Sequence, residues 1–521
     1  MQKNFLPLLL FYISISVYSQ NSNFTILCIA AHPDDEDGAT LAYYSRIKGF
    51  DAYTIFYTRG EGGQNEIGPE LYDELGKIRE RECYDAAEIQ GSKVYFLGFL
   101  DLGYSKTAKE TFKFWGGEDS VLARIVYIIR VIRPDVVITN HDTITTKPKR
   151  QHGHHQVSGI TIYNAFEKAA DPNYHPEQLV NGVEPWKIKK LYFRQNDTNV
   201  NDVFEIDVSQ KDKSGKTIEE IYYDALAKHK TQGMDKVDRN YTGKRRYELI
   251  RSDKTYPVSR NDLFEGIAPT EKPKINVELK SYPTRYTYYK INPEDSLRIL
   301  NSLKFRKGIK IGLVRTYDNS VENVLKAFQI DFDTLSDYDL NEKPLYTYST
   351  IILDIRAYFY RPELIKNNHK ILNYIADSGS VVCFYHKPSD WNGRNFAPYP
   401  IYLTNQRVTE EGALVKQQKN TLYIWSEPNI INHMDWDGWI QERNIYLPSD
   451  DTSLTSRHYS RLLSMQDEND PVPSTSLMIA GYEKGTYVYC SLALYRQLKL
   501  FHEGALKLFL NMISLSRWFR Y

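Results

Sequence analysis

The chain of 521 residues has little cysteine, no excess of charge of either sign and no long apolar segment, and each lack excludes a class of protein. Lys plus Arg and Asp plus Glu each total 66, so the formal net charge is zero and neither nucleic acid nor an anionic membrane surface is an expected partner. The four cysteines, Cys28, Cys83, Cys383 and Cys490, are far apart in apolar stretches, which favours free buried thiols over a disulfide framework. The length predicts two or three domains.

The N-terminal segment has the pattern of a targeting sequence. Lys3 precedes an apolar run over 5–17, and Val17 and Ser19 are small residues where a signal peptidase reads the chain. The run is shorter than the about 20 residues of a membrane-spanning helix. No cysteine follows it that would carry a lipid anchor. We expect residues 1–19 to be a signal peptide, and the mature protein to be periplasmic or secreted and to lack a transmembrane segment.

Short apolar runs alternate with amphipathic stretches in the first part of the chain, which predicts an α/β domain. Strands are expected at 24–29, 52–57, 94–97 and 135–139, and helices at 37–48, 71–89 and 120–132. This order is typical of a mostly parallel, Rossmann-like sheet covered on both faces. His32, Arg59 and His141 each follow one of these strands, so they are expected on the rim where such sheets bind ligands.

A second α/β pattern follows a proline-punctuated segment. Before that segment we expect strands at 191–193 and 203–208 and a helix at 218–229; after it we expect strands at 309–314, 349–353, 381–385 and 485–492, and helices at 321–327, 362–377 and 504–514. The predicted domains are therefore 24–268 and 303–521, joined by a linker over 269–302.

The most informative motif is Ala31-His32-Pro33-Asp34-Asp35-Glu36, which follows the first strand. A helix start here would put His32 and Asp35 on one face, with Pro33 at the first helical position. A neutral histidine and a carboxylate suit zinc and other divalent metals, and a catalytic site needs a third ligand. Gln151-His152-Gly153-His154-His155-Gln156 offers one, since three of the chain's 12 histidines fall within four positions.

Each motif alone has a plainer interpretation. A histidine after a strand is commonly structural, and a run of carboxylates commonly caps a helix. The occurrence of both motifs on one rim favours the metal site.

The motif from Ala31 to Glu36 resembles the signature of the PIG-L-type (LmbE-like) zinc-dependent deacetylases, which remove an acetyl group from N-acetylated amino sugars. The resemblance continues through 58–65, 78–82, 97–101 and the histidines of 152–155, and covers roughly residues 24–268. It implies that His32 and Asp35 bind zinc and that Asp34 is the general base for attack of zinc-bound water on the acetamide carbonyl.

The same resemblance implies the remaining roles. The His-x-x-His spacing maps His155 onto the third zinc ligand and His152 onto the histidine that polarises the carbonyl or stabilises the tetrahedral oxyanion. For the second role we expect a protonated His152. Many relatives have Pro-Asp where this chain has Gly153-His154, which leaves His154 open as the ligand. Arg79 and Asp101 match positions associated with substrate hydroxyl contacts; the alternatives are a helix salt bridge and a turn cap.

Residues from about 303 to 521 resemble the flavodoxin-like fold of class I glutamine amidotransferases, without their activity. No Gly-x-Cys-x-Gly elbow is present, and Cys383 lies in a predicted strand, which favours a structural thiol.

Three functions remain open on this basis. The first is an exported zinc deacetylase acting on an N-acetylated sugar or glycan. The second is a glycan-binding surface protein with an inactive deacetylase-like domain, and the third is an amidase or esterase with another acyl substrate. The sequence leaves the sugar, the native metal, the role of the second domain and the oligomeric state open.

Overall fold

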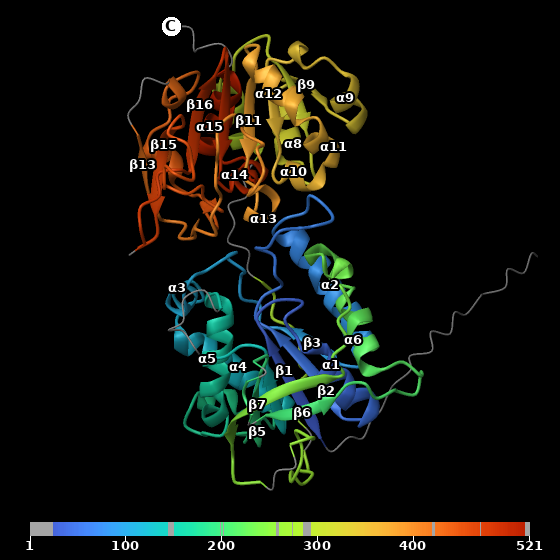
Figure 1. Ribbon diagram of the computed structural model, residues 1–521. Coiled ribbons are helices and arrows are strands. Elements are labelled where there is room, and N and C mark those ends of the chain that lie inside the picture. Colours follow the sequence, from blue (N-terminus) through green and yellow to red (C-terminus); the bar gives the residue numbers. More distant parts are fainter. Residues whose placement is uncertain are drawn as a thin grey trace, which may run out of the picture.

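The computed structural model describes residues 24–515, apart from 144–150, 198, 202, 257–259, 273–274, 285–292, 419–422 and 469. The predicted signal peptide lies outside these residues, as does part of the predicted linker. Two α/β domains lie end to end, each built on its own mostly parallel sheet (Figure 1). Across the described ranges, no helix combines the length and the apolar character needed to span a membrane.

The first domain holds a seven-stranded sheet. Its elements are β1 (Thr25–Ala30), α1 (Gly38–Ala42), the π-helical turn η1 (Tyr43–Ile47), β2 (Asp51–Phe56), α2 (Asp73–Gln90), β3 (Lys93–Phe96), α3 (Ala108–Phe114), α4 (Glu118–Ile132), β4 (Val136–Thr139), α5 (Gly153–Lys168), η2 (Pro176–Gln178), β5 (Lys190–Arg194), β6 (Phe204–Asp207), α6 (Ile218–Leu226), η3 (Lys230–Gln232), η4 (Met234–Lys236) and β7 (Lys244–Ser252). The strand order is β3-β2-β1-β4-β5-β7-β6, and the first five strands are parallel, as expected of a Rossmann-like sheet.

Burial explains why β1 is central. All six of its residues are buried, because helices cover both faces of the sheet. Leu27 and Ile29 pack with α4 and α5, whereas Ile26 and Cys28 pack with α1 and α6. The first four predicted strands agree with β1 to β4 within one residue, while α3, α5 and β7 were not predicted.

The second domain holds an eight-stranded sheet. Its elements are α7 (Pro293–Ser302), β8 (Lys310–Val314), α8 (Ser320–Ala327), β9 (Asp331–Thr334), α9 (Asp337–Glu342), η5 (Leu345–Thr347), β10 (Thr350–Leu353), α10 (Ala357–Tyr360), α11 (Pro362–Lys366), α12 (Asn368–Ala376), β11 (Ser380–Phe384), α13 (Pro388–Trp391), β12 (Arg407–Val408), β13 (Leu414–Gln417), η6 (Tyr423–Trp425), η7 (His433–Trp436), β14 (Asn444–Ile445), β15 (Ser460–Gln466), β16 (Leu477–Tyr482), β17 (Gly485–Cys490), α14 (Leu494–Lys499) and α15 (Glu503–Ser514). The order is β13-β15-β16-β17-β11-β10-β8-β9, parallel from β17 to β9 and antiparallel in the remaining pairs. The helix predicted over 362–377 is two helices, α11 and α12, which meet at Asn367.

The domains meet where the parallel strands of each sheet end. Residues 60–72, here called the interdomain loop, leave the first domain after β2 and reach the second (Figure 1). Leu71 and Tyr72 at its far end belong to the apolar core of the second domain, packed among residues of α8, α14 and α15. The carboxyl ends of the two sheets therefore face one another across this loop.

Part of the predicted linker has a defined place. The backbone N–H of Tyr282 donates to the Phe96 carbonyl (2.8 Å), and the Ser281 hydroxyl accepts from the Phe96 N–H (3.1 Å), so this segment runs along β3. Residues 293–302 form α7, whose Ile299 packs into the core of the second domain.

The four cysteines are free and buried, as predicted.

Candidate metal centre and interdomain pocket

The turn between β1 and α1 brings two predicted ligands together. The Asp35 N–H donates to the His32 carbonyl (3.2 Å), and Asp37 caps α1 by accepting from the Thr40 N–H (3.0 Å). The helix thus begins at Gly38, so the expectation that His32 and Asp35 share a helix face was wrong. They face each other across the turn instead, which also contains Pro33.

Three side chains form a triangle of metal-binding atoms. Nδ1 of His32 lies 2.9 Å from Oδ2 of Asp35, Nε2 of His155 lies 3.1 Å from the same oxygen, and the two ring nitrogens are 3.3 Å apart. Tetrahedral zinc with bonds of about 2.0–2.1 Å holds its ligand atoms roughly 3.3 Å apart. The donor set therefore fits a single divalent ion.

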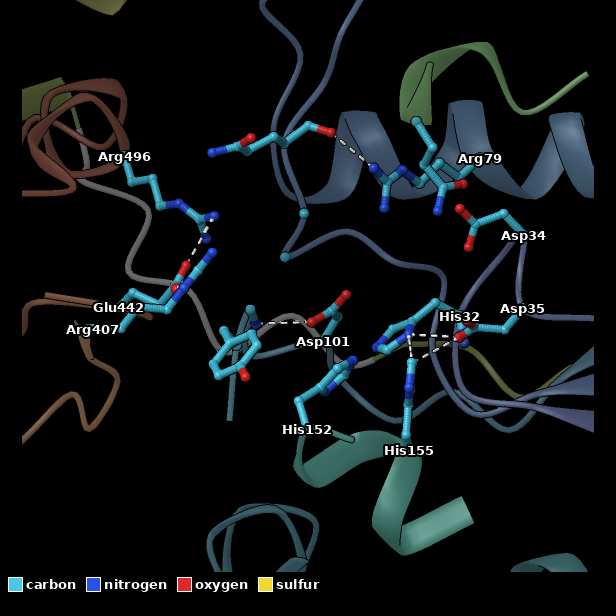
Figure 2. Close-up of a pocket in the computed structure, with 16 residues that line it drawn as sticks. His32, Asp34, Asp35, Arg79, Asp101, His152, His155, Arg407, Glu442 and Arg496 are labelled. Carbon is cyan, nitrogen blue, oxygen red and sulfur yellow. Dashed lines mark hydrogen bonds and ion pairs between the residues drawn. The ribbon is translucent and has the colours of Figure 1, made fainter. Parts of the chain in front are cut away.

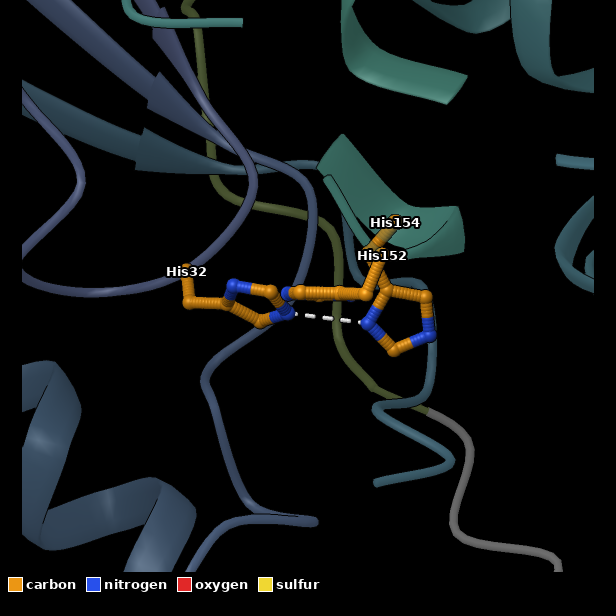
Figure 3. A group of neighbouring side chains, drawn as sticks. All are labelled: His32, His152 and His154. Atoms are coloured by element: carbon orange, nitrogen blue, oxygen red, sulfur yellow. Dashed lines mark hydrogen bonds between the residues drawn. The ribbon is translucent and has the colours of Figure 1, made fainter. Parts of the chain in front are cut away.

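His154, the alternative third ligand, lies on the other side of His32. Its ring is fully buried, stacks on Trp115 (centroids 5.0 Å apart) and places Nδ1 2.8 Å from Nε2 of His32 (Figure 3). His32, His152 and His154 form a second possible metal group through this nitrogen. The group with Asp35 is favoured, because it includes a carboxylate and all three of its members line the pocket described below.

Asp34 is half-buried beside Asp35 in a strained backbone conformation, with φ at 83°. Burial raises the pKa of this carboxyl to about 7, and the neighbouring charge of Asp35 adds to the rise. A carboxylate with this pKa exchanges a proton readily near neutral pH, which is the property of a general base.

His152 precedes α5 and lines the pocket. Burial and the neighbouring imidazoles lower its pKa well below the usual range, so the ring is neutral here. This contradicts the expected protonated form.

Arg79 and Asp101 both line the pocket, but their contacts are with the protein. Arg79, on α2, donates to the carbonyls of Gly60 and Gln64 and to the Thr231 hydroxyl, and so holds the interdomain loop; the alternative of a helix salt bridge was wrong. Asp101 accepts from the Gly103 N–H (2.8 Å), which is the predicted turn cap.

A side chain at position 63 would displace the Arg79 guanidinium, because a Cβ at Gly63 would lie 2.7 Å from Nη1 of Arg79.

Sequence reasoning missed a buried pair beneath the turn. The Glu36 carboxylate accepts from Nε2 of Gln90 (3.1 Å) and lies 3.3 Å from Nε2 of His229. The Gln232 side chain donates to the Pro33 carbonyl (2.7 Å), so the segment after α6 supports the metal-binding turn.

The pocket has a volume of about 350 Å³ and is shared by the two domains. Figure 2 shows the metal-donor side chains at one end and Arg407, Glu442 and Arg496 of the second domain at the other, with Asp101 between them. None of these three residues was predicted, since nothing in the sequence placed the second domain over the first.

The comparisons with known proteins agree with the geometry of the first domain. Residues 27–166 match the family model described as PIG-L, GlcNAc-PI de-N-acetylase, and this part of the chain is a PIG-L family deacetylase domain.

Two curated relatives are each described as a 1D-myo-inositol 2-acetamido-2-deoxy-alpha-D-glucopyranoside deacetylase. That of Thermobispora bispora is 33% identical over 185 residues, covering 32% of this chain and 57% of the relative. That of Rhodococcus jostii is 32% identical over 186 residues, covering 32% and 60%. The chain thus spans under two thirds of the length of either relative.

A similar solved structure is the N,N'-diacetylchitobiose deacetylase from Pyrococcus horikoshii in complex with its inhibitor MPG. It is 19% identical, with a TM-score of 0.32, over 43% of this chain and 83% of that one.

Proposed function

We propose that the protein is an exported, zinc-dependent N-deacetylase that removes the acetyl group from an N-acetylated amino sugar or glycoconjugate. The observation that carries the proposal is the triangle of His32, Asp35 and His155 beside a half-buried Asp34 whose pKa is raised to about 7. The PIG-L family domain supports the same chemistry. Export rests on the N-terminal sequence pattern alone.

His32, Asp35 and His155 would hold the metal ion. When bound, such an ion supplies a water molecule of lowered pKa and polarises the substrate carbonyl. The donor set also suits iron, cobalt and manganese. If Nδ1 of His32 held the metal, its Nε2 would carry a proton and donate to Nδ1 of His154, 2.8 Å away, and His154 would thereby fix the orientation of His32.

Asp34 would accept the proton of the attacking water and return it to the departing amine. As a neutral ring, His152 would stabilise the developing oxyanion by donating one hydrogen bond. Each role uses a side chain that lines the pocket.

The second domain would be a flavodoxin-like, glutamine-amidotransferase-like unit without amidotransferase activity. Numbered in chain order, its parallel strands run 2-1-3-4-5, which is the flavodoxin order. Cys383 lies within β11, and burial raises the pKa of its thiol to about 12, so it is a poor nucleophile despite an imidazole 4.0 Å away at His386.

Metal analysis with a product assay tests the function. The purified full chain, loaded in turn with zinc, iron, cobalt and manganese, is incubated with a panel of N-acetylated sugars, and free amine and acetate are both measured. Equal release of amine and acetate, dependent on metal, is expected. Acetate without amine would indicate an esterase, and bound sugar with neither product would favour the glycan-binding alternative.

A further inference from the structure

We propose that the second domain completes the substrate site, and that its Arg407–Glu442–Arg496 cluster binds an acidic group, a phosphate or a carboxylate, on the N-acetylated sugar. The inference rests on the proposed deacetylase function for the identity of the sugar. It assigns the second domain a direct part in choosing the substrate.

The charge of the cluster carries the argument. Arg407 pairs with Oε1 of Glu442, and Nη2 of Arg496 lies 3.5 Å from Oε2 of the same carboxylate. Two guanidinium groups that are always charged thus share one carboxylate, which leaves one positive charge in excess. Glu442 and Arg496 are each only 3% exposed, and an unbalanced charge in such a place is costly unless an anion joins it.

The cluster also retains hydrogen-bonding capacity. Arg407 donates through Nη2 to the Tyr446 hydroxyl (2.9 Å), and Arg496 through Nε to the Tyr495 hydroxyl (2.9 Å). A guanidinium has five N–H donors. Among the described residues, Nη1 of Arg496 makes no hydrogen bond, and it lies 3.3 Å from where a Cβ of Gly103 would stand, on the rim of the pocket.

The position of the cluster suits a substituent on the sugar whose acetamide is at the metal centre. The Tyr104 ring lies 5.4 Å from the His152 ring, and Cζ of Arg407 lies 4.6 Å from the Tyr104 centroid. Tyr104 therefore adjoins both the proposed reaction centre and the cluster, and it lines the same pocket. An aromatic face between two polar ends is a suitable floor for a sugar ring.

The two walls of the pocket are fixed relative to each other. Glu66 of the interdomain loop pairs with Arg356 (3.1 Å) and accepts from the Tyr360 hydroxyl, and Gln64 donates to the Tyr385 hydroxyl (2.7 Å). The Tyr72 hydroxyl donates to the carbonyl of Arg496 itself (3.0 Å). The loop that lines the metal end of the pocket is thus bonded to the helix that carries Arg496.

Matched acidic and neutral ligands test the proposal on the full chain loaded with metal. N-acetylglucosamine 6-phosphate is compared with N-acetylglucosamine, and a disaccharide of N-acetylglucosamine and glucuronic acid with its glucose counterpart. Affinity is measured by calorimetry and kcat/KM by amine release. The wild type is expected to prefer the acidic member of one pair by tenfold or more, and the pair that shows this identifies phosphate or carboxylate.

In Arg407→Gln, the ratio of affinities for the acidic over the neutral ligand is expected to fall close to one. Arg407→Lys is expected to give an intermediate ratio. Arg461→Gln is the matched control, because Arg461 is similarly exposed (21% against 19%) and also pairs with a carboxylate, Asp450, but does not line the pocket. It should leave both ratios unchanged. Melting curves confirm that each variant folds.

Equal affinity for acidic and neutral ligands in both pairs would overturn the proposal, as would a preference that persists in Arg407→Gln. Failure of the deacetylase function gives a different result, in which no sugar releases amine while calorimetry still reports the preference for the acidic ligand.

Discussion

Asp34 is half-buried next to a second carboxylate, and its backbone is held at a positive φ. A non-glycine residue pays for that conformation with strain, and such strain concentrates at functional sites. The turn therefore fixes a carboxyl group of raised pKa at the wall of the pocket rather than letting it turn to solvent.

Replacing Asp34 by Asn tests its role as base. Asn tolerates positive φ and has nearly the same shape, so folding and metal content should be preserved. We expect kcat to fall by about 10²–10⁴-fold, the usual contribution of a positioned base. The measurement is amine release by protein whose metal content has been determined. Wild-type activity in a metal-loaded Asp34→Asn protein would exclude this role.

The two adjacent histidines, His154 and His155, should differ sharply in their effect on the metal. His155→Ala removes a donor atom of the triangle and is expected to abolish stoichiometric binding. His154→Gln disturbs only the ring that bonds His32, so metal should still bind, about 10–100-fold more weakly. Competition with a chelator measures both. Loss of stoichiometric metal in His154→Gln, with metal retained in His155→Ala, would reverse the assignment.

At the scale of elements, the interdomain loop both lines the pocket and packs into the core of the second domain. Its near end, with Gly62, Gly63 and Gln64, lines the pocket, and its far end contributes Leu71 and Tyr72 to the second core. Arg79 holds the near end from α2, and Arg356 holds Glu66 in the middle. A substitution in the middle of the loop should therefore alter the order of the loop at both of its ends.

Glu66→Gln removes the charge that pairs with Arg356. Hydrogen bonds to charged groups contribute about 1.5–3 kcal/mol, so we expect amide exchange in 60–72 to become about tenfold faster or more. KM should rise while metal content stays the same. Hydrogen exchange read by mass spectrometry gives the first value. Glu205→Gln on the far edge strand is the control, and equal exchange in the two variants would contradict the prediction.

The elements of the first sheet could be predicted because each leaves a local pattern, an apolar run of strand length or a helical period. The start of α1 agrees with the helix predicted over 37–48, but the interpretation of the acidic run as a helix N-terminus with Pro33 at its first position was wrong, because Asp37 caps the helix. The contact between Glu36 and His229 joins residues far apart in the chain, and no local pattern indicates it. His154 could be named as an alternative but not assigned, since spacing does not show which nitrogen of His32 a neighbour meets.

At the scale of the whole molecule, the second domain places two acidic side chains beyond the ends of β8 and β10. Asp318 and Asp354 are both buried. Burial and, to a smaller extent, the charge of Asp318 together raise the pKa of Asp354 to about 8. The folded protein therefore holds Asp354 protonated at neutral pH.

The raised pKa of Asp354 predicts that the stability of the protein depends on pH. The pKa of Asp354 in the folded protein is raised above its ordinary value of 3.8. The contribution of Asp354 to the free energy of unfolding is therefore complete below pH 3.8 and is lost as the pH rises through about 8. The melting temperature of the wild type should fall between pH 5 and 9, and Asp354→Asn should flatten this part of the profile. Calorimetry across that range measures it, and parallel profiles for the two proteins would contradict the assignment.

The sharing of the pocket could not be predicted from the sequence. Arg407 and Arg496 are separated from the metal motif by more than three hundred residues, and their distance to it depends on how two sheets dock. Composition and periodicity describe each domain separately, so they predict the two sheets but not the surface between them.

The interdomain loop also limits how this protein can be rebuilt. A chimaera that exchanged the first domain for a single-domain homologue would need residues 60–72 transplanted with it, because Leu71 and Tyr72 fill space inside the other core and Tyr72 bonds the helix of Arg496. Without Leu71 and Tyr72, the second domain would have an exposed apolar cavity on the surface that contacts the first domain. The two halves are therefore a single unit for engineering, and a truncation between them would not yield an intact first domain.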